Sequence, residues 1–326
     1  MSAPVPVELI EFIRSGSLFI VAGHKEPDGD CVGSQLALCS ALERLGKEAV
    51  PCSAGPFKRT EVIPYAARFS AAPGKTAGAK VVIVDCASPD RTGGLAAHLE
   101  GLPTARIDHH DYRAEGGPRV SPEAPFFLDP AAPSATVMIL SLIEALGLSP
   151  TKAEAQMLLL GLCTDTGFFR HLDENAAESF SAARRMIDAG ASPKAAFQAI
   201  NGGKSLKSRI LLGHILSRSE ALFEGRLILS FENFEDARVF GLEGRDSDSL
   251  YQLLQSVAGV EAIVIIREET PEKCTVGFRS RDQIDVAAIA ASFGGGGHKN
   301  AAGLAIAGTI SDIKPRIIEA FARVFH

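Results

Sequence analysis

The sequence lacks paired cysteines, long apolar runs and an excess of basic residues. Six cysteines are spread singly over the 326 residues, and no two of them form a CxxC pair. Cys39 and Cys163 stand among apolar neighbours, which is typical of reduced, buried thiols and unlike the disulfide framework of a small secreted protein. The remaining composition, 46% hydrophobic and 22% charged residues, is normal for a soluble globular protein.

Segments that would direct the chain to a membrane or to secretion are also missing. No apolar run approaches the roughly 18 residues that a membrane span needs. The N-terminal stretch MSAPVPVELIEFIRSGS lacks the basic start and the long apolar centre of a signal peptide. We therefore expect a cytoplasmic protein without a membrane partner.

The formal net charge of −6 shows no basic surplus. Proteins that track long nucleic acids usually carry a basic face that is visible in their composition. The charge balance therefore argues against binding long duplex or single-stranded polymers through bulk electrostatics. It allows a short anionic substrate that a few local cations and metal ions hold.

The length and the order of elements predict two α/β domains. A chain of 326 residues is too long for one ordinary core. Apolar strands alternate with helices in the first half, which predicts a mostly parallel sheet, and a less patterned stretch follows. We expect one domain over 1–189, a linker over 190–206 and a smaller domain over 207–326. The expected strands are 18–22, 48–52, 80–85, 105–108, 221–231, 261–267 and 274–279, and the main helices 35–45, 91–99, 134–146, 151–164, 175–189, 206–219, 247–257 and 285–292.

Imidazoles and carboxylates follow several of these elements at the point where each one ends. Ligands of open α/β sheets collect outside the carboxyl ends of the strands, so these side chains are expected to converge. Converging carboxylates repel one another unless cations neutralise them. Taken alone, the first motif, His24 with Asp28 and Asp30, is also compatible with a polar turn that caps a helix. The residues concerned are His24, Asp28, Asp30, Asp85, Asp108, His109, His110 and Asp165.

The donor types indicate which metal would bind. Carboxylates and imidazoles without a thiolate suit Mn²⁺-like ions, while Mg²⁺ favours still more oxygen. Two ions about 3.5–4 Å apart that share a carboxylate form the arrangement that clamps the attacking and leaving oxygens in phosphoryl transfer.

A glycine-rich loop near the C-terminus is the second candidate site. Gly294–Gly297 precede His298, Lys299 and Asn300. Glycines allow close approach to a phosphate, and successive amides can form an anion-binding nest. A flexible hinge is the alternative on composition alone.

The motifs together resemble a known family. HKEPDGDCVGS, VDCASPDRTG, IDHHD and CTDTGFFR, in this order, are similar to the four motifs of the DHH phosphoesterase superfamily. The segment from Gly277 through GGGGHKNAAG resembles the DHHA1 domain. The layout is similar to the oligoribonuclease/pAp-phosphatase (nanoRNase) subfamily, which also includes cyclic di-AMP phosphodiesterases.

This resemblance implies a role for each motif residue. His24, Asp28 and Asp85 would hold one divalent ion. The second ion would be held by Asp30, Asp85, His109 and Asp165, and Asp85 would bridge the two ions. Mn²⁺ is expected, with Mg²⁺ or Co²⁺ possible. The catalytic residues would be Asp85 and His110, which faces the substrate phosphate, while Asp108 would orient a histidine. The family often has an asparagine shortly after its DHH triplet, whereas this chain reads Asp111-Tyr112-Arg113.

The resemblance also implies a substrate and a place for it. A metal-bridged hydroxide would hydrolyse nanoRNA of a few nucleotides, or pAp, in a cleft between the two domains, and the protein could form a homodimer. The alternatives left open are a cyclic di-AMP phosphodiesterase, a RecJ-type exonuclease, an inorganic pyrophosphatase and a nucleotide sensor without activity. The end of the nucleotide remote from the scissile phosphate would contact Arg279, Ser280, Gly295, Gly296, Gly297, His298 and Asn300.

Overall fold

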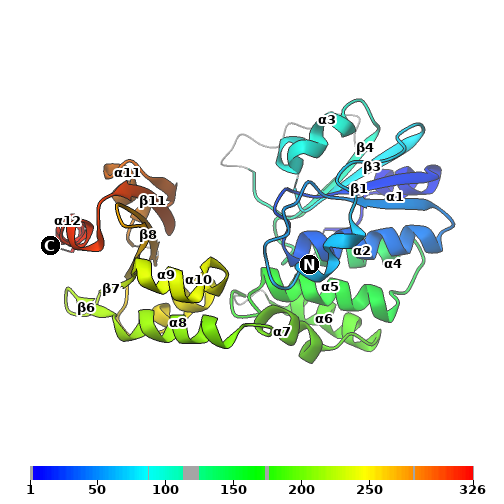
Figure 1. The fold of residues 1–326 in the computed structure, drawn as a ribbon. Helices are drawn as coiled ribbons and strands as arrows, with labels where there is room; N and C mark the ends of the chain where they lie inside the picture. Colours follow the sequence, from blue (N-terminus) through cyan, green and yellow to red (C-terminus); the bar gives the residue numbers. More distant parts are fainter. Residues whose placement is uncertain (1–2, 87, 113–124, 173–175, 282, 326) are drawn as a thin grey trace. The chain divides into compact units, whose positions relative to one another are not determined.

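The fold was analysed in a computed structural model that describes residues 3–325 except 87, 113–124, 173–175 and 282. The chain forms two compact units, unit 1 over Met1–Gly203 and unit 2 over Lys204–His326 (Figure 1). Among the described residues, no helix is both long enough and apolar enough to cross a bilayer.

Unit 1 is built on a five-stranded sheet in which all neighbouring strands are parallel. The strand order is β2-β1-β3-β4-β5, so β1 and β3 are neighbours at the point where the winding of the chain reverses. Such a switch point is where open α/β sheets bind ligands. The strands are β1 (Leu18–Ala22), β2 (Glu48–Cys52), β3 (Ala79–Val84), β4 (Thr104–Asp108) and β5 (Phe126–Leu128).

Alternate residues of these strands point to opposite faces of the sheet, and both faces are buried. Phe19 and Val21 of β1 belong to the large core that the long helices cover, whereas Ile20 and Ala22 pack with Leu95 and Leu99 on the other face. The helices are α1 (Val7–Ser15), α2 (Gly29–Arg44), α3 (Ala96–Leu99), α4 (Ala135–Ala145), α5 (Lys152–Asp165), α6 (Ala177–Asp188) and α7 (Pro193–Asn201), with 3₁₀ turns at Ile63–Arg68 and Pro89–Leu95.

Unit 2 contains a six-stranded sheet of order β10-β11-β9-β8-β7-β6. The β7–β8 pair is parallel and the other pairs are antiparallel. The strands are β6 (Glu220–Leu222), β7 (Leu227–Glu232), β8 (Ala262–Thr270), β9 (Lys273–Ser280), β10 (Gly296–His298) and β11 (Ala301–Ala307). The helices are α8 (Leu206–Ser217), α9 (Phe234–Phe240), α10 (Ser247–Gln255), α11 (Val286–Ser292) and α12 (Ile310–Ala322), and a 3₁₀ turn spans Leu242–Gly244.

The α/β class and the parallel sheet are confirmed, and β1 and β2 have the expected bounds. The expected start of α2 at residue 35 is wrong. The helix begins at Gly29 because Asp28 accepts the amides of Asp30 and Cys31 and so caps it. The expected helix at 91–99 is replaced by a 3₁₀ turn and the short α3.

Three further segments differ from the expectation. The stretch expected as a linker, 190–206, contains α7, which packs on α5 within unit 1. The glycine loop forms strand β10, which pairs with β11. The short elements β5 and α9 were not expected at all.

Candidate metal centre

The carboxyl ends of three neighbouring strands carry the side chains that were expected to bind metal. His24 follows β1, Asp85 follows β3, and His109 follows β4. Because these strands are parallel and adjacent, the three residues meet at one edge of the sheet. Helices α2 and α5 bring in the carboxylates of Asp28, Asp30 and Asp165.

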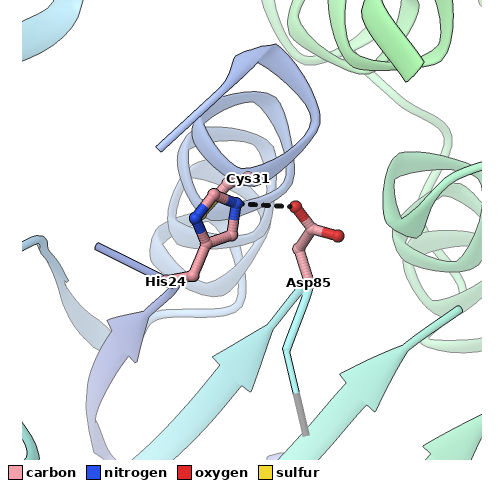
Figure 2. A group of neighbouring side chains, drawn as sticks. All are labelled: His24, Cys31 and Asp85. Atoms are coloured by element: carbon pink, nitrogen blue, oxygen red, sulfur yellow. Dashed lines mark ion pairs between the residues drawn. The ribbon is translucent and has the colours of Figure 1, made fainter. Parts of the chain in front are cut away.

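The imidazole of His24 presents one nitrogen to this centre. Its Nδ1 lies 2.8 Å from the carbonyl oxygen of Lys25, which can only accept, so Nδ1 donates. Its Nε2 lies 3.3 Å from Oδ2 of Asp85 and 3.9 Å from Oδ1 of Asp28, and Figure 2 shows the ion pair with Asp85. Burial lowers the pKa of this imidazole, but Asp28 and Asp85 outweigh burial and raise the pKa above its ordinary value. A bound cation can replace the proton that the carboxylates favour.

A second imidazole, His109, points Nε2 toward three carboxylates. The nitrogen lies 3.4 Å from Oδ2 of Asp165, 3.5 Å from Oδ1 of Asp85 and 3.8 Å from Oδ2 of Asp30. Nε2 is buried and has no hydrogen-bond partner in the described part of the chain. A buried donor or acceptor left in this state calls for an explanation. An ion held between the nitrogen and the carboxylates supplies one.

Asp85 lies between the two histidines. One carboxylate oxygen faces His24 and the other faces His109. The backbone φ of Asp85 is 58°, a left-handed conformation that is uncommon outside glycine and that aspartate tolerates better than most residues. Its amide donates to the carbonyl of Ile107 at 2.9 Å and so fixes the residue against β4. Strained backbone of this kind clusters at functional sites.

Glycines let α2 and α5 pack closely enough for Asp30 and Asp165 to reach the centre. A Cβ on Gly33 would lie 2.4 Å from the carbonyl oxygen of Met157, and a Cβ on Gly161 would lie 2.9 Å from Oδ1 of Asp30. The carboxylate of Asp30 is also fixed by the amino terminus of α4. There it accepts, at 2.6 and 2.9 Å, the amides of Ala135 and Thr136.

The electrostatics of the centre favour a cation. Burial and the neighbouring carboxylates of Asp85 and Asp165 raise the pKa of Asp30 well above its usual range. Burial and the nearby Asp85 raise the pKa of Asp165 to about 6, although His109 opposes this effect. Only histidines form ion pairs with these aspartates in the portion of the chain that the structure describes. A divalent ion would relieve this repulsion, so the side chains present fit a divalent metal site.

The possible ligand atoms of this centre form three groups, and the atoms inside each group lie within 4.8 Å of one another. They include every expected ligand except Asp28, whose Oδ1 caps α2 at 3.1 Å from the amides of Asp30 and Cys31. They also include the thiol of Cys31, which was not among the predicted ligands. The groups are His24–Cys31–Asp85, Asp85–His109–His110 and Asp30–His109–Asp165.

His110 is held by Asp108. The Nδ1 atom of His110 lies 2.7 Å from Oδ1 of Asp108. The other oxygen of Asp108 accepts the hydroxyl of Tyr112, a buried residue that the sequence analysis did not assign a role. Burial raises the pKa of Asp108, but His110 and Tyr112 outweigh burial and lower it. The charged Asp108 therefore keeps a proton on Nδ1 of His110 and leaves Nε2 directed elsewhere.

Of the side chains expected to bind substrate in unit 2, two lie in one row of the sheet and another is buried in the fold. His298 on β10 and Arg279 on β9 are both opposite Ala301 of β11, so the three lie in one row across the sheet. The guanidinium carbon of Arg279 stacks 4.6 Å from the ring centroid of Tyr251. In contrast to the expectation, the hydroxyl of Ser280 is buried and donates to the carbonyl of Ile284 at 2.7 Å, so it serves the fold.

Two glycines of the loop, Gly295 and Gly297, are required by the sheet itself. A Cβ on Gly295 would lie 2.5 Å from the carbonyl oxygen of Gly303, and one on Gly297 would lie 2.5 Å from that of Ala301. Gly296 is exposed, and a Cβ there would meet nothing within 4 Å. The backbone of Asn300 contributes to the same packing, since its carbonyl accepts the amide of Ser280 at 3.0 Å.

Known proteins share both units. The N-terminal domain of the DHH family matches residues 18–162, and the DHHA1 domain matches residues 236–326. The chain is 32% identical over 302 residues to the bifunctional oligoribonuclease and PAP phosphatase NrnA of Thermus thermophilus, which covers 92% of this chain and 88% of that protein. Its identity to the protein of the same name from Bacillus subtilis is 26% over 304 residues, or 91% and 92% of the two chains.

The fold has a counterpart among solved structures as well. An exopolyphosphatase-related protein from Bacteroides fragilis superposes with a TM-score of 0.79 over 98% of this chain and 94% of that one, at 19% identity. Because the sequence identity is low, this likeness shows a shared fold and nothing more. The extended match to the Thermus protein, together with the two domain matches, establishes that the chain belongs to the DHH family of phosphoesterases.

Proposed function

We propose that the protein is a metal-dependent phosphoesterase that hydrolyses short oligoribonucleotides and pAp, which it converts to AMP and phosphate. The observation that carries this proposal is Asp85 between two imidazoles. One oxygen lies 3.3 Å from Nε2 of His24, and the other lies 3.5 Å from Nε2 of His109. The relatives named as oligoribonucleases and PAP phosphatases match 92% and 91% of this chain, over 88% and 92% of their own lengths.

Two divalent ions, with Mn²⁺ the preferred metal, fit this arrangement. We assign His24, Asp28 and Asp85 to one ion. The other would be held by Asp30, Asp85, His109 and Asp165, with Asp85 shared. Such a pair activates water as the nucleophile and neutralises the charge that develops on the phosphate. Mn²⁺ prefers binding sites whose donor atoms are mainly oxygen and nitrogen.

His110 acts on the substrate from beside the metals. Its Nδ1 proton is kept in place by Asp108 at 2.7 Å, and Tyr112 fixes Asp108 from the other side. When Nε2 is protonated as well, the ring is an imidazolium, and Nε2 can donate a hydrogen bond or a proton to the phosphate. Fixing the imidazole in advance means that it need not reorganise during the reaction.

Unit 2 would hold the far end of the nucleotide. Arg279 and His298 lie in one row of the sheet, and the exposed Gly296 precedes His298. A guanidinium and exposed backbone amides are suited to a second phosphate or a base. A substrate that reaches both sites gains affinity, whereas a longer strand gains nothing more. The cleft between the domains and the homodimer stay predictions.

A comparison of turnover rates tests this function. With Mn²⁺ present, we expect pAp, a dinucleotide and a five-nucleotide RNA to be hydrolysed at least about tenfold faster, in kcat/KM, than a long single strand. Cyclic di-AMP is the fourth substrate, and preference for it over the linear substrates would favour a cyclic dinucleotide phosphodiesterase. Equal rates on the long strand would refute the length limit. No hydrolysis of any phosphoester by the Mn²⁺-loaded protein would refute the function itself.

A further inference from the structure

The thiol of Cys31 lies at the metal centre, although none of the roles described above uses it. Of the six cysteines, Cys31 is the one that falls in a group of possible metal ligands among the described residues. Its sulfur, a nitrogen of His24 and a carboxylate oxygen of Asp85 all lie within 4.8 Å of one another. Figure 2 shows the three side chains together, with Cys31 behind the imidazole in that view.

The fold fixes Cys31 in this position through its backbone. The residue lies in the first turn of α2, and its amide donates to Oδ1 of Asp28 at 3.1 Å. Asp28 in turn lies 3.9 Å from Nε2 of His24. The carboxylate that caps the helix therefore holds the backbone of Cys31 and also lies near the imidazole of His24.

The space around the sulfur is shaped to contain it. Cys31 is fully buried, and a Cβ on Gly23 would lie only 2.2 Å from Sγ. The sulfur also lies 3.5 Å from Oε1 of Gln35, whose amide nitrogen is fixed at 2.8 Å by each of the carbonyls of Val21 and Cys52. Gln35 thus turns an acceptor toward the thiol, and Gly23 leaves room for it.

We infer that Cys31 is a further ligand of the metal ion held by His24 and Asp85, and that it shifts the preference of this position toward softer ions such as Zn²⁺ and Co²⁺. When the sulfur binds the ion, the S–H bond breaks, a sulfur–metal bond forms and the proton leaves to solvent. Thiolate ligands favour Zn²⁺ over Mn²⁺, whereas carboxylates and water favour Mn²⁺ and Mg²⁺. This inference rests on the metal site of the proposed function. It adds that the two ions would occupy chemically different positions, since among the described residues no cysteine joins the group around His109 and Asp165.

Cobalt absorption tests this inference without relying on activity. The full chain is titrated with Co²⁺, and the near-ultraviolet charge-transfer band of a thiolate–Co²⁺ bond is recorded. We expect the band in the native protein and its loss in Cys31→Ala and Cys31→Ser. Cys39→Ala is the matched control, because Cys39 lies on the same helix and is buried in the apolar core. This control should keep the band.

Metal affinities give a second readout. We expect Cys31→Ala to weaken Zn²⁺ binding at least about tenfold relative to Cys39→Ala. The same change should leave Mn²⁺ binding within about twofold, because a hard ion gains little from sulfur. Unchanged Zn²⁺ affinity in folded Cys31→Ala and Cys31→Ser would overturn the inference.

The outcomes separate this inference from the proposed function. A protein that binds Co²⁺ and hydrolyses short substrates without a thiolate band would refute the role of Cys31 alone. A band that persists in both Cys31 variants would do the same. A protein that binds no divalent ion would refute both proposals.

Discussion

Each unit contains a cluster of buried carboxylates, but the two clusters are neutralised differently. In unit 2 the fully buried Glu232 lies between two arginines, at 2.8 Å from Nε of Arg245 and 3.2 Å from Nε of Arg267. Arg245 also pairs with Glu269 at 3.0 Å. In unit 1 the buried Asp30 and Asp85 have only histidines as ion-pair partners among the described residues.

This difference indicates which cluster is structural and which is functional. A buried charge is tolerated when a partner in the same fold compensates it, as in unit 2. Where the chain gathers carboxylates and supplies no cation of its own, the compensating charge has to come from outside. The partners of the buried carboxylates therefore indicate a metal site better than the number of carboxylates does.

The largest effect is expected from the carboxylate shared in unit 1. Asp85→Ala and Asp85→Asn should each reduce kcat/KM on short oligonucleotides at least about 1,000-fold, because both proposed ions lose a ligand. Asparagine tolerates the left-handed backbone of this position, so Asp85→Asn separates the lost charge from backbone strain. Metal content measured on both purified variants should fall together with activity. Full activity in either variant would contradict the shared role of Asp85.

Breaking the compensated cluster of unit 2 should act on stability. Arg245→Met leaves Glu232 with one arginine, and we expect a loss of about 3–5 kcal/mol in the free energy of unfolding, measured in urea. Arg238→Met is the control, because its pair with Glu235 is exposed and should matter little. Metal binding by unit 1 should be unchanged in folded Arg245→Met. A variant as stable as the native protein would show that the cluster is not structural.

Added metal should stabilise one unit only. At Mn²⁺ concentrations about 100-fold above Kd, we expect the metal-binding unit to gain about 2.7 kcal/mol. Amide hydrogen exchange should show the gain in β1 and β3, with β8 and β9 unchanged, and chelation should reverse it. Equal protection in both units would argue against a metal site confined to unit 1.

A smaller effect is expected from the residue that supports Asp108. Tyr112→Phe removes the hydroxyl that Asp108 accepts, so the imidazole of His110 is less firmly oriented. We expect kcat to fall about tenfold, with KM and metal content unchanged. The kinetics should be compared with those of His110→Ala. If Tyr112→Phe loses metal instead of turnover, Tyr112 supports the metal ligands and not His110.

The smallest effect concerns a carboxylate of unit 2 and depends on pH. Burial raises the pKa of Asp236, but Arg218 and the amide of Asn233 outweigh burial and lower it. A carboxyl whose pKa is lower when folded stabilises the fold above its unfolded pKa of about 3.9. Asp236→Asn should therefore cost about 1 kcal/mol at pH 7.

This cost should shrink as the pH falls below about 4 and through the folded pKa. Urea unfolding of both proteins between pH 7 and pH 3 measures it. A stability difference that grows toward acid pH would contradict the sign.

Much of unit 1 could be predicted because its signals are local. β1 is a short continuous apolar run, and the residues that follow the strands are the chemical ones, so the sequence indicated both the elements and the edge where His24, Asp85 and His109 meet. The start of α2 was missed because the capping by Asp28 depends on the path of the chain before the helix. β10 was missed because its glycines have no strand propensity and pair only through contacts with β11.

The sequence by itself determined the α/β class, the family motifs and the donor atoms that a divalent ion would meet. Only the tertiary structure decided that Asp85 divides its two oxygens between His24 and His109, and that Ser280 is used by the fold. It also decided that the thiol of Cys31 turns toward the imidazole and that Tyr112 supports Asp108. The physical reason is that residue types and spacing are written along the chain. The direction of each side chain depends on helix caps, close glycine contacts and neighbouring strands.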